Sequence, residues 1–253
     1  MSSILSRIAV AAAGLPLVLF AAYYGRWALF ALAALAALLA LHELYQMARS
    51  LRPLVLAGYA GALAAVLGAS LGGAEWMVGG LMVTILLAFV FAAVSETRQS
   101  TTVAVATTVL GAAWIGRGLG HLVLLRDLDP DGREILITVL ITVFVADTFA
   151  YVGGRLAGRH KMAPAISPGK TWEGFVAGLV GGVLTPWIAV NQEPIPIDGW
   201  EAFAFGGVIV LAAVAGDLFE SMVKRDLGVK DSGRVLLGHG GVLDRVDSLV
   251  FAG

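Results

Sequence analysis

The sequence predicts an all-α fold, a polytopic transmembrane helical bundle with eight full spans and a short ninth helix. Hydrophobic residues make up 58% of the 253 residues and charged residues only 14%, whereas soluble domains carry about 25% charged residues. The apolar residues form runs of roughly 20 residues, the length that crosses a bilayer core about 30 Å thick. These runs lack the alternation of membrane β-strands, which favours helices over a barrel.

Eight such runs follow one another along the chain. They cover residues 8–24, 27–45, 54–71, 77–94, 103–125, 135–152, 175–190 and 202–219. The first run resembles a signal peptide, but the second follows at once without a clear cleavage site, so we expect it to be retained. The second run ends near His42 and Glu43, which we expect at the membrane surface without a catalytic role. A ninth run begins near Val242 and stops at Gly253, too short for an ordinary span, so we expect a truncated last helix.

The chain divides into two regions of different composition. Residues 1–114 are predicted to be a transmembrane scaffold, because their runs contain little besides Ala, Leu, Val and Gly. Residues 115–253 carry polar side chains within and between apolar runs, and they are predicted to be the catalytic region with its motif loops. Gly174, Gly178 and Gly182 recur at a spacing of four residues. This ridge predicts close packing against a neighbouring helix.

The positive charges predict how the bundle is oriented. If the loop 155–170, which holds four Lys and Arg residues, faces the cytoplasm, the other loops follow by alternation. Thirteen of the 17 Lys and Arg residues then fall inside and three outside, while Arg117 lies within a span. This bias predicts a cytoplasmic N-terminus and places both polar stretches of the catalytic region on the cytoplasmic side.

One polar stretch begins at the end of the eighth run. Asp217, Glu220, Ser221 and Lys224 stand at spacings that share one face of a helix. A carboxylate at membrane depth is costly unless it is paired or binds a metal, so Asp217 is a candidate functional residue. The alternative interpretation is a structural ion pair with Lys224 or Arg225.

Cations, glycines and carboxylates continue to alternate beyond this helix. The segments are Lys224-Arg225-Asp226, Lys230-Asp231-Ser232-Gly233, Gly238-His239-Gly240-Gly241 and Asp244-Arg245-Val246-Asp247-Ser248. Carboxylates favour a hard cation such as Mg²⁺, which needs only one or two of them when substrate phosphates complete its coordination. Nearby Lys and Arg side chains would hold the phosphates. The chain has no cysteine, which excludes thiolate nucleophiles and Cys-ligated metals.

The stretch from Ser221 to Asp247 resembles the signature of the phosphatidate cytidylyltransferases, also called CDP-diacylglycerol synthases. That signature runs Ser-x-hydrophobic-Lys-Arg, Lys-Asp-x-small, His-Gly-Gly and Asp-Arg-x-Asp, and this sequence matches each part. The segments 147–155 and 167–174 also resemble family motifs. The resemblance covers residues 115–253, whereas the first hundred residues or so match only as a hydrophobic pattern.

The resemblance implies an enzyme that transfers the cytidylyl group of CTP to phosphatidic acid and releases pyrophosphate. We expect Asp217 and Asp244 to bind Mg²⁺. Asp147, Asp231 and Asp247 are candidates for a second cation or an outer shell. The expected phosphate-binding residues of the catalytic set are Lys170, Lys224, Arg225, His239 and Arg245. Further substrate-binding candidates are Ser167, Thr171, Ser221, Lys230, Gly240 and Gly241.

Other interpretations stay open at this point. The nearest is a CTP-dependent lipid kinase of the polyprenol or dolichol type, which would release CDP instead of pyrophosphate. A transporter could use Asp147 and Asp217 as an ion path, but it would predict inverted repeats that the sequence lacks. The expected partners are CTP and membrane lipid, with no nucleic acid, and the family implies a homodimer. The expected location is a bacterial inner membrane, with the site facing the cytoplasm.

Overall fold

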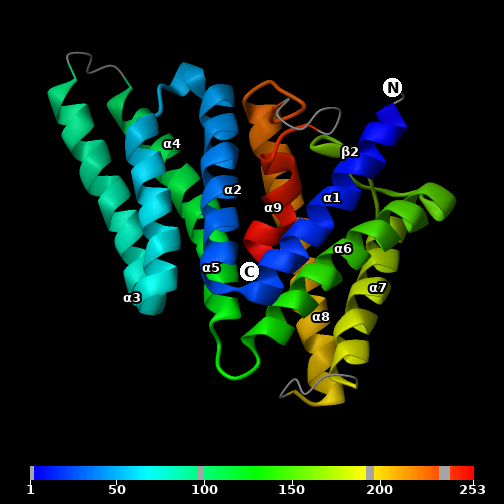
Figure 1. Ribbon diagram of the computed structural model, residues 1–253. Coiled ribbons are helices and arrows are strands. Elements are labelled where there is room, and N and C mark those ends of the chain that lie inside the picture. The colour runs from blue at the N-terminus through cyan, green and yellow to red at the C-terminus, as the bar shows by residue number, and fades with distance from the viewer. Residues whose placement is uncertain (1–2, 96–99, 192–196, 234–239) are drawn as a thin grey trace.

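The computed structural model describes residues 3–95, 100–191, 197–233 and 240–253, and almost all of them are helical (Figure 1). The longer helices are α1 (Ser3–Tyr24), α2 (Arg26–Met47), α3 (Val55–Val94), α4 (Thr101–Gly111), α5 (Arg117–Arg126), α6 (Gly132–Ala157), α7 (Trp172–Val190), α8 (Gly199–Asp226) and α9 (Leu243–Ala252). A 3₁₀ turn η1 (Arg49–Leu51) follows α2, and a π-helical segment η2 (Ala112–Gly116) joins α4 to α5. The prediction of an all-α membrane bundle is confirmed.

A small β-hairpin is the only β-structure among the described residues. Strands β1 (Lys161–Ala163) and β2 (Ser167–Thr171) pair antiparallel, with Lys161 opposite Thr171. They lie between α6 and α7, within the loop that holds the Ser-Pro-Gly-Lys-Thr motif. The hairpin therefore gives a defined backbone to three predicted site residues, Ser167, Lys170 and Thr171.

Helix α3 is a hairpin of two antiparallel halves. Its chain reverses at Gly73, whose φ of 73° and ψ of −157° lie in a region essentially restricted to glycine. Beyond the turn, Gly80 packs directly against the backbone of Ala65. Figure 1 shows the two halves side by side. The sequence predicts these halves as two separate apolar runs.

Six helices are long and apolar enough to cross a membrane in the described part of the chain. They cover residues 27–47, 55–94, 101–126, 132–157, 172–190 and 199–226. The second of them is the folded-back α3, and the third joins α4, η2 and α5. Large hydrophobic side chains such as Leu56 and Phe89 lie on the outside, where they are 69% and 67% exposed. This exposure fits a surface that faces lipid, because water would disfavour it.

The interior of the bundle is built mainly from small side chains. Ala37, Ala40 and Ala62 are completely buried in the core formed by α2, α3 and α5. On the other side, Gly174 and Gly178 of α7 lie against the backbone of α6 at Ala150 and Ala146. The predicted glycine ridge is therefore confirmed as a packing surface, and it brings α6 and α7 close together.

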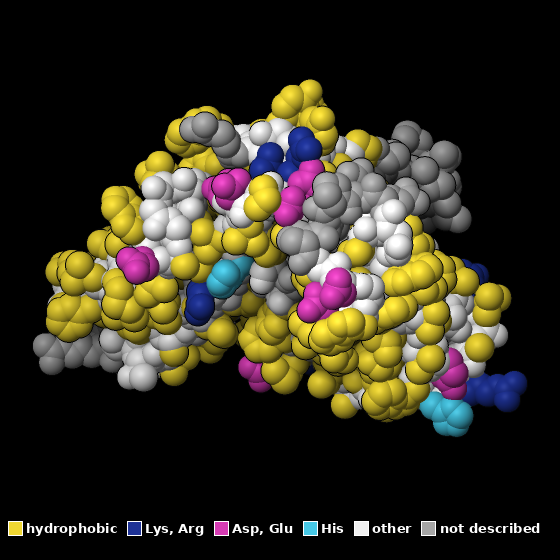
Figure 2. Space-filling model, turned by 90° about the horizontal axis from the view of Figure 1, so that it is seen from below, with side chains coloured by type: hydrophobic (Ala, Val, Ile, Leu, Met, Phe, Trp, Pro, Cys, Tyr) yellow, Lys and Arg dark blue, Asp and Glu magenta, His cyan; other side chains and the backbone are white. Residues whose placement is uncertain are grey.

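The polar connections gather at one end of the bundle. The start of α1, the turn after α2, the β-hairpin and the described part of the α8–α9 connection all lie at the upper end in Figure 1. The turn between α1 and α2, the α3 reversal and the α5–α6 turn lie at the lower end. Figure 2 shows that lower end covered mainly by hydrophobic side chains, with few charged ones. The motif residues are therefore concentrated at the upper end.

Candidate active site

Lys224 lies at the centre of the site, between two carboxylates. Its Nζ atom is 2.6 Å from Oε2 of Glu220 on the preceding turn of α8 and donates a hydrogen bond of 2.7 Å to Oδ1 of Asp244 at the start of α9. The side chains of Lys224 and Asp244 are each 13% exposed, and that of Glu220 is 2% exposed. These largely buried charges stabilise one another and fix α9 against the end of α8.

Asp244 is held by the backbone as well as by Lys224. It accepts hydrogen bonds from the backbone N–H of Gly241 at 2.7 Å and from that of Ser232 at 3.3 Å. The loop bends back at Gly240, whose φ is 78°. Burial raises the pKa of Asp244, but its interaction with Glu220 and the hydrogen bonds that it accepts from Lys224 and the Gly241 N–H outweigh burial and lower the pKa to about 2. Asp244 is therefore a carboxylate throughout the physiological pH range.

Five acidic side chains form what we call the carboxylate row: Asp147, Asp217, Asp247, Glu220 and Asp244. Each acts electrostatically on at least one other member, and the row extends from α6 across α8 to α9. Asp247 is buried, and this burial, with the negative charges of Asp217 and Asp147, raises its pKa to about 7. Such a concentration of negative charge favours the binding of cations.

Lys170 of β2 neutralises Asp217, the member of the carboxylate row that lines the cavity described below. Its Nζ atom lies 2.8 Å from Oδ2 of Asp217, and Oδ1 of the same carboxylate accepts a hydrogen bond of 3.3 Å from the Ser221 hydroxyl. The next residue, Thr171, is buried, and its Oγ1 accepts a hydrogen bond of 3.2 Å from the Gly174 N–H at the start of α7. The cap fixes the end of β2 and so positions Lys170.

A cavity of about 530 Å³ opens beside the Lys170–Asp217 pair. Its polar lining includes Asp147 and Arg155 of α6 together with Ser167, Lys170 and Asp217. Its apolar lining comes from Tyr151, Met162, Phe175 and Val214. Carboxylate, cationic and apolar surfaces thus meet in one space, which suits a ligand with both a phosphate group and hydrocarbon.

The other predicted site residues differ in how they relate to this centre. Arg225 is exposed and donates hydrogen bonds to the carbonyl oxygens of Ile166 at 3.2 Å and Val229 at 3.4 Å. Arg245 is exposed and close enough to Asp147 to interact with its charge. Lys230 and Asp231 are exposed. Gly241 is buried and donates its N–H to Asp244, and His239 lies outside the described residues.

Two acidic residues that the sequence analysis did not assign to the site belong to its structure. Glu220 was placed on the polar face of α8 without a role, yet it binds Lys224 and is almost completely buried. Glu43 was expected at the membrane surface, but it is 2% exposed and accepts hydrogen bonds from residues 232, 242 and 243. The expectation for Glu43 was wrong because α9 covers this face of α2.

The donor set suits a hard cation that arrives with a phosphate-bearing substrate. The described residues contain no group of three or more His, Cys, Asp or Glu side chains arranged to hold a metal ion. However, Oε1 of Glu220 is buried and has no hydrogen-bond partner in the described part of the chain. Mg²⁺ needs only one or two carboxylates when phosphates supply further oxygens. The carboxylate row therefore fits Mg²⁺ by its chemistry.

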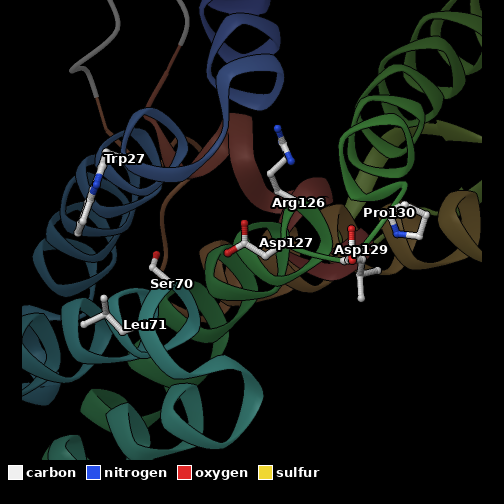
Figure 3. Close-up of a pocket in the computed structure, with 8 residues that line it drawn as sticks. Trp27, Ser70, Leu71, Arg126, Asp127, Asp129 and Pro130 are labelled. Atoms are coloured by element: carbon white, nitrogen blue, oxygen red, sulfur yellow. The ribbon is translucent and has the colours of Figure 1, made fainter.

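A second pocket, of about 460 Å³, lies at the opposite end of the bundle (Figure 3). It is lined by residues of the α5–α6 turn, including Arg126 and Asp127, together with Trp27 and Ser70. Arg126 is engaged there, since its Nε donates a 2.8 Å hydrogen bond to the Ala22 carbonyl. None of the predicted site residues lines this pocket.

Comparison with known proteins agrees with the motifs at the α8–α9 site. The model of the cytidylyltransferase family matches residues 5–253, nearly the whole chain. The chain belongs to the cytidylyltransferase family. Members of this family include the phosphatidate cytidylyltransferases that the chain matches, so the resemblance inferred from the motifs is confirmed.

Three relatives of this family illustrate the extent of the similarity. The phosphatidate cytidylyltransferase of Staphylococcus haemolyticus is 38% identical over 143 residues, 56% of this chain and 54% of the relative. That of Haemophilus influenzae is 43% identical over 129 residues, 49% and 45% of the two chains. That of Staphylococcus epidermidis is 35% identical over 181 residues, 70% and 68%. The chain thus spans about half the length of the first two relatives.

Proposed function

We propose that this protein transfers the cytidylyl group of CTP to phosphatidic acid, forming CDP-diacylglycerol and pyrophosphate. The observation that carries the proposal is the carboxylate row neutralised by Lys170 and Lys224 beside an amphipathic cavity. The printed names of the relatives support the same reaction.

The reaction needs orientation and charge neutralisation more than a strong base. A phosphate oxygen of phosphatidic acid, already ionised, attacks the α-phosphorus of CTP and forms the new P–O bond. The bond from the α-phosphorus to the oxygen that bridges to the β-phosphorus breaks, and pyrophosphate leaves with that electron pair. Such phosphoryl transfers depend on positioning and on cations that offset the developing charge.

Asp217 and Asp244 are the proposed Mg²⁺ ligands, and Asp147 and Asp247 are proposed to assist them or to hold a second cation. When bound, Mg²⁺ would neutralise triphosphate oxygens and stabilise the leaving pyrophosphate. Asp231 is the weakest candidate, because its side chain is exposed and no ion pair of the described residues involves it.

The cationic residues have complementary proposed roles. Lys170 and Lys224 contact the carboxylate row directly and can exchange these contacts for substrate phosphates. Arg225, Lys230 and Arg245 are exposed, and we propose that they bind the outer phosphates of CTP. Ser167 and Thr171 are proposed to bind or position substrate from β2, Ser221 from α8 and Gly240 and Gly241 from the loop before α9, and His239 stays a further candidate.

The proposed topology comprises eight spans of a bacterial plasma membrane, with the upper end of the bundle in Figure 1 on the cytoplasmic side. Counting the two halves of α3 separately and adding α1 raises the six candidate helices to the eight predicted runs. The excess of Lys and Arg in the loops at the upper end supports the orientation. CTP would then reach the site from the cytoplasm and phosphatidic acid from the bilayer.

The decisive experiment identifies the product that carries the label. Purified protein is incubated with phosphatidic acid, Mg²⁺ and CTP labelled either at the α-phosphorus or at the γ-phosphorus. Label from the α-position in the lipid product, with γ-label released as pyrophosphate, supports the proposal. γ-Label in the lipid product with CDP as the second product would instead identify a lipid kinase.

A further inference from the structure

Glu43 is the only acidic residue in the sequence of α2, a helix composed largely of Ala and Leu. It lies about one turn before the end of the helix, and its side chain points into the protein with 2% of its surface exposed. None of the ion pairs among the described residues includes Glu43. Burial of a lone carboxylate is costly, so other contacts must stabilise it.

Both oxygens of Glu43 accept hydrogen bonds from the segment that leads into α9. Oε1 accepts from the backbone N–H of Val242 at 2.9 Å, and Oε2 accepts from that of Leu243 at 2.8 Å. Oε2 also accepts a hydrogen bond of 3.2 Å from the Ser232 hydroxyl. Three donors from a region about 200 positions away in sequence therefore converge on one carboxylate.

These contacts give α9 its N-terminal cap. The first N–H groups of a helix have no partner within the helix, and Val242 at the cap position forms no side-chain cap bond. The Glu43 carboxylate takes that role from another helix, and its negative charge lies at the positive end of the α9 dipole. Glu43 of α2 thus provides the stabilisation that a capping side chain at the start of α9 would otherwise give.

The same contacts fix Asp244, which directly follows Leu243. Ser232 joins the two acids, because its hydroxyl binds Glu43 while its N–H binds Asp244. Gly233 and Gly241 lie so close to the Glu43 carboxylate that a Cβ atom at either position would clash with it. Residues 232, 233 and 241–243 therefore pack around Glu43, and Asp244 projects from the start of α9 towards Lys224.

We infer that Glu43 is a positioning residue of the active site: by capping α9 it sets the place of the Asp244 carboxylate in the carboxylate row. The expected effect on catalysis rests on the proposed function, because it assumes that Asp244 takes part in the cation and phosphate chemistry. The contacts from Glu43 to residues 232, 242 and 243 stand without it.

The test uses Glu43→Gln in the full-length protein, in detergent or nanodiscs. The amide has nearly the same shape, but it replaces one acceptor oxygen with an NH₂ donor and removes the charge. We expect kcat/KM for CTP to fall about 10- to 100-fold, the range for groups that orient metal-binding carboxylates. We also expect the Mg²⁺ concentration for half-maximal rate to rise, which a loss of folded protein alone would not produce.

A second measurement does not depend on activity. Hydrogen–deuterium exchange should quicken in peptides covering residues 240–247 of Glu43→Gln and stay unchanged in α7. If the wild-type protein makes no CDP-lipid, the proposed function fails, while the exchange data still decide whether Glu43 holds this segment. Wild-type Mg²⁺ dependence together with wild-type exchange at 240–247 would overturn the inference.

Two further variants keep the test decisive. His42→Gln changes the neighbouring α2 residue, which is exposed and bonded to Tyr59 and Gln46, and should leave both readouts unchanged. If Glu43→Gln does not fold, Ser232→Ala removes one donor to Glu43 and should raise the half-maximal Mg²⁺ concentration and lower kcat/KM about 2- to 10-fold. Wild-type values in Ser232→Ala would then overturn the inference.

Discussion

The ammonium group of Lys224 lies 2.7 Å from Oδ1 of Asp244, and this contact joins the end of α8 to the start of α9 although 20 positions separate the two residues. Glu220 contacts the same ammonium group at 2.6 Å. Two carboxylates therefore share one cation in a largely buried place. Loss of the cation would leave both negative charges close together without compensation.

Replacing Lys224 with Met tests this arrangement. We expect a loss of about 3–5 kcal/mol in stability, because removing one partner of a buried ion pair leaves uncompensated charge. The measurement is thermal unfolding of the detergent-solubilised variant, with turnover of labelled CTP in parallel. Lys161→Met in exposed β1 is the matched control and should unfold like the wild type. An equally stable Lys224→Met protein would show that the contacts of Lys224 with Glu220 and Asp244 do not hold α8 and α9 together.

Replacing Asp244 with Asn tests its proposed role as a Mg²⁺ ligand. The variant keeps the side-chain shape, and Lys224 keeps Glu220 as a partner, so we expect folded protein. Turnover should fall by more than about 100-fold, beyond the usual effect of an outer-shell partner. Asp127→Asn, at the opposite end of the bundle, should retain wild-type turnover. Wild-type turnover of Asp244→Asn would remove this residue from the metal site.

Chelation extends the same test to the metal itself. Addition of EDTA to the wild-type protein should abolish formation of the labelled lipid, because the chelator would remove the ion from the carboxylate row without unfolding the protein. Excess Mg²⁺ should restore the activity. Asp217→Asn should need a higher Mg²⁺ concentration for half-maximal rate. Full turnover in EDTA would contradict a role for a divalent cation.

The sequence predicts the helices of this protein better than the contacts among them. Apolar runs locate α6, α7 and α8, and even the reversal inside α3 falls between two predicted runs, since span length and hydropathy are local properties. The spacing in α8 likewise predicts a shared face for Glu220 and Lys224, and their ion pair confirms it. Local periodicity is sufficient for both.

Contacts across the bundle could not be read in the same way. The pairing of Lys170 with Asp217 depends on a β-hairpin in a loop that has no strong strand pattern. Glu43 stands at the end of a membrane run, where exposed charged groups are common, and only the packing of α9 over α2 buries it. In the sequence, only the glycines at 233 and 241 point to this burial of Glu43, because a side chain at either position would clash with its carboxylate.

The α3 reversal gives a prediction about stability alone. In Gly73→Ala a Cβ atom would have free space, but the backbone conformation is strained for any residue except glycine. We expect a loss of about 1–3 kcal/mol with activity retained in the folded fraction. Gly79→Ala is the control, because Gly79 also has free space and lies in ordinary helix, where alanine is favourable. Equal thermal unfolding of the two variants would contradict this account of the turn.

The orientation of the bundle can be tested because the sequence contains no cysteine, so any introduced thiol is unique. Ser50 in η1 and Asp127 after α5 are exposed, and the turns that hold them lie at opposite ends of the bundle. In intact cells, a membrane-impermeant maleimide should label Asp127→Cys, while Ser50→Cys should react only after the membrane is opened, because the Lys- and Arg-rich end is expected in the cytoplasm. Prior labelling with a permeant maleimide controls for thiol reactivity. The opposite pattern would place the carboxylate row outside, where cytosolic CTP could not reach it, and would contradict the proposed function together with the topology.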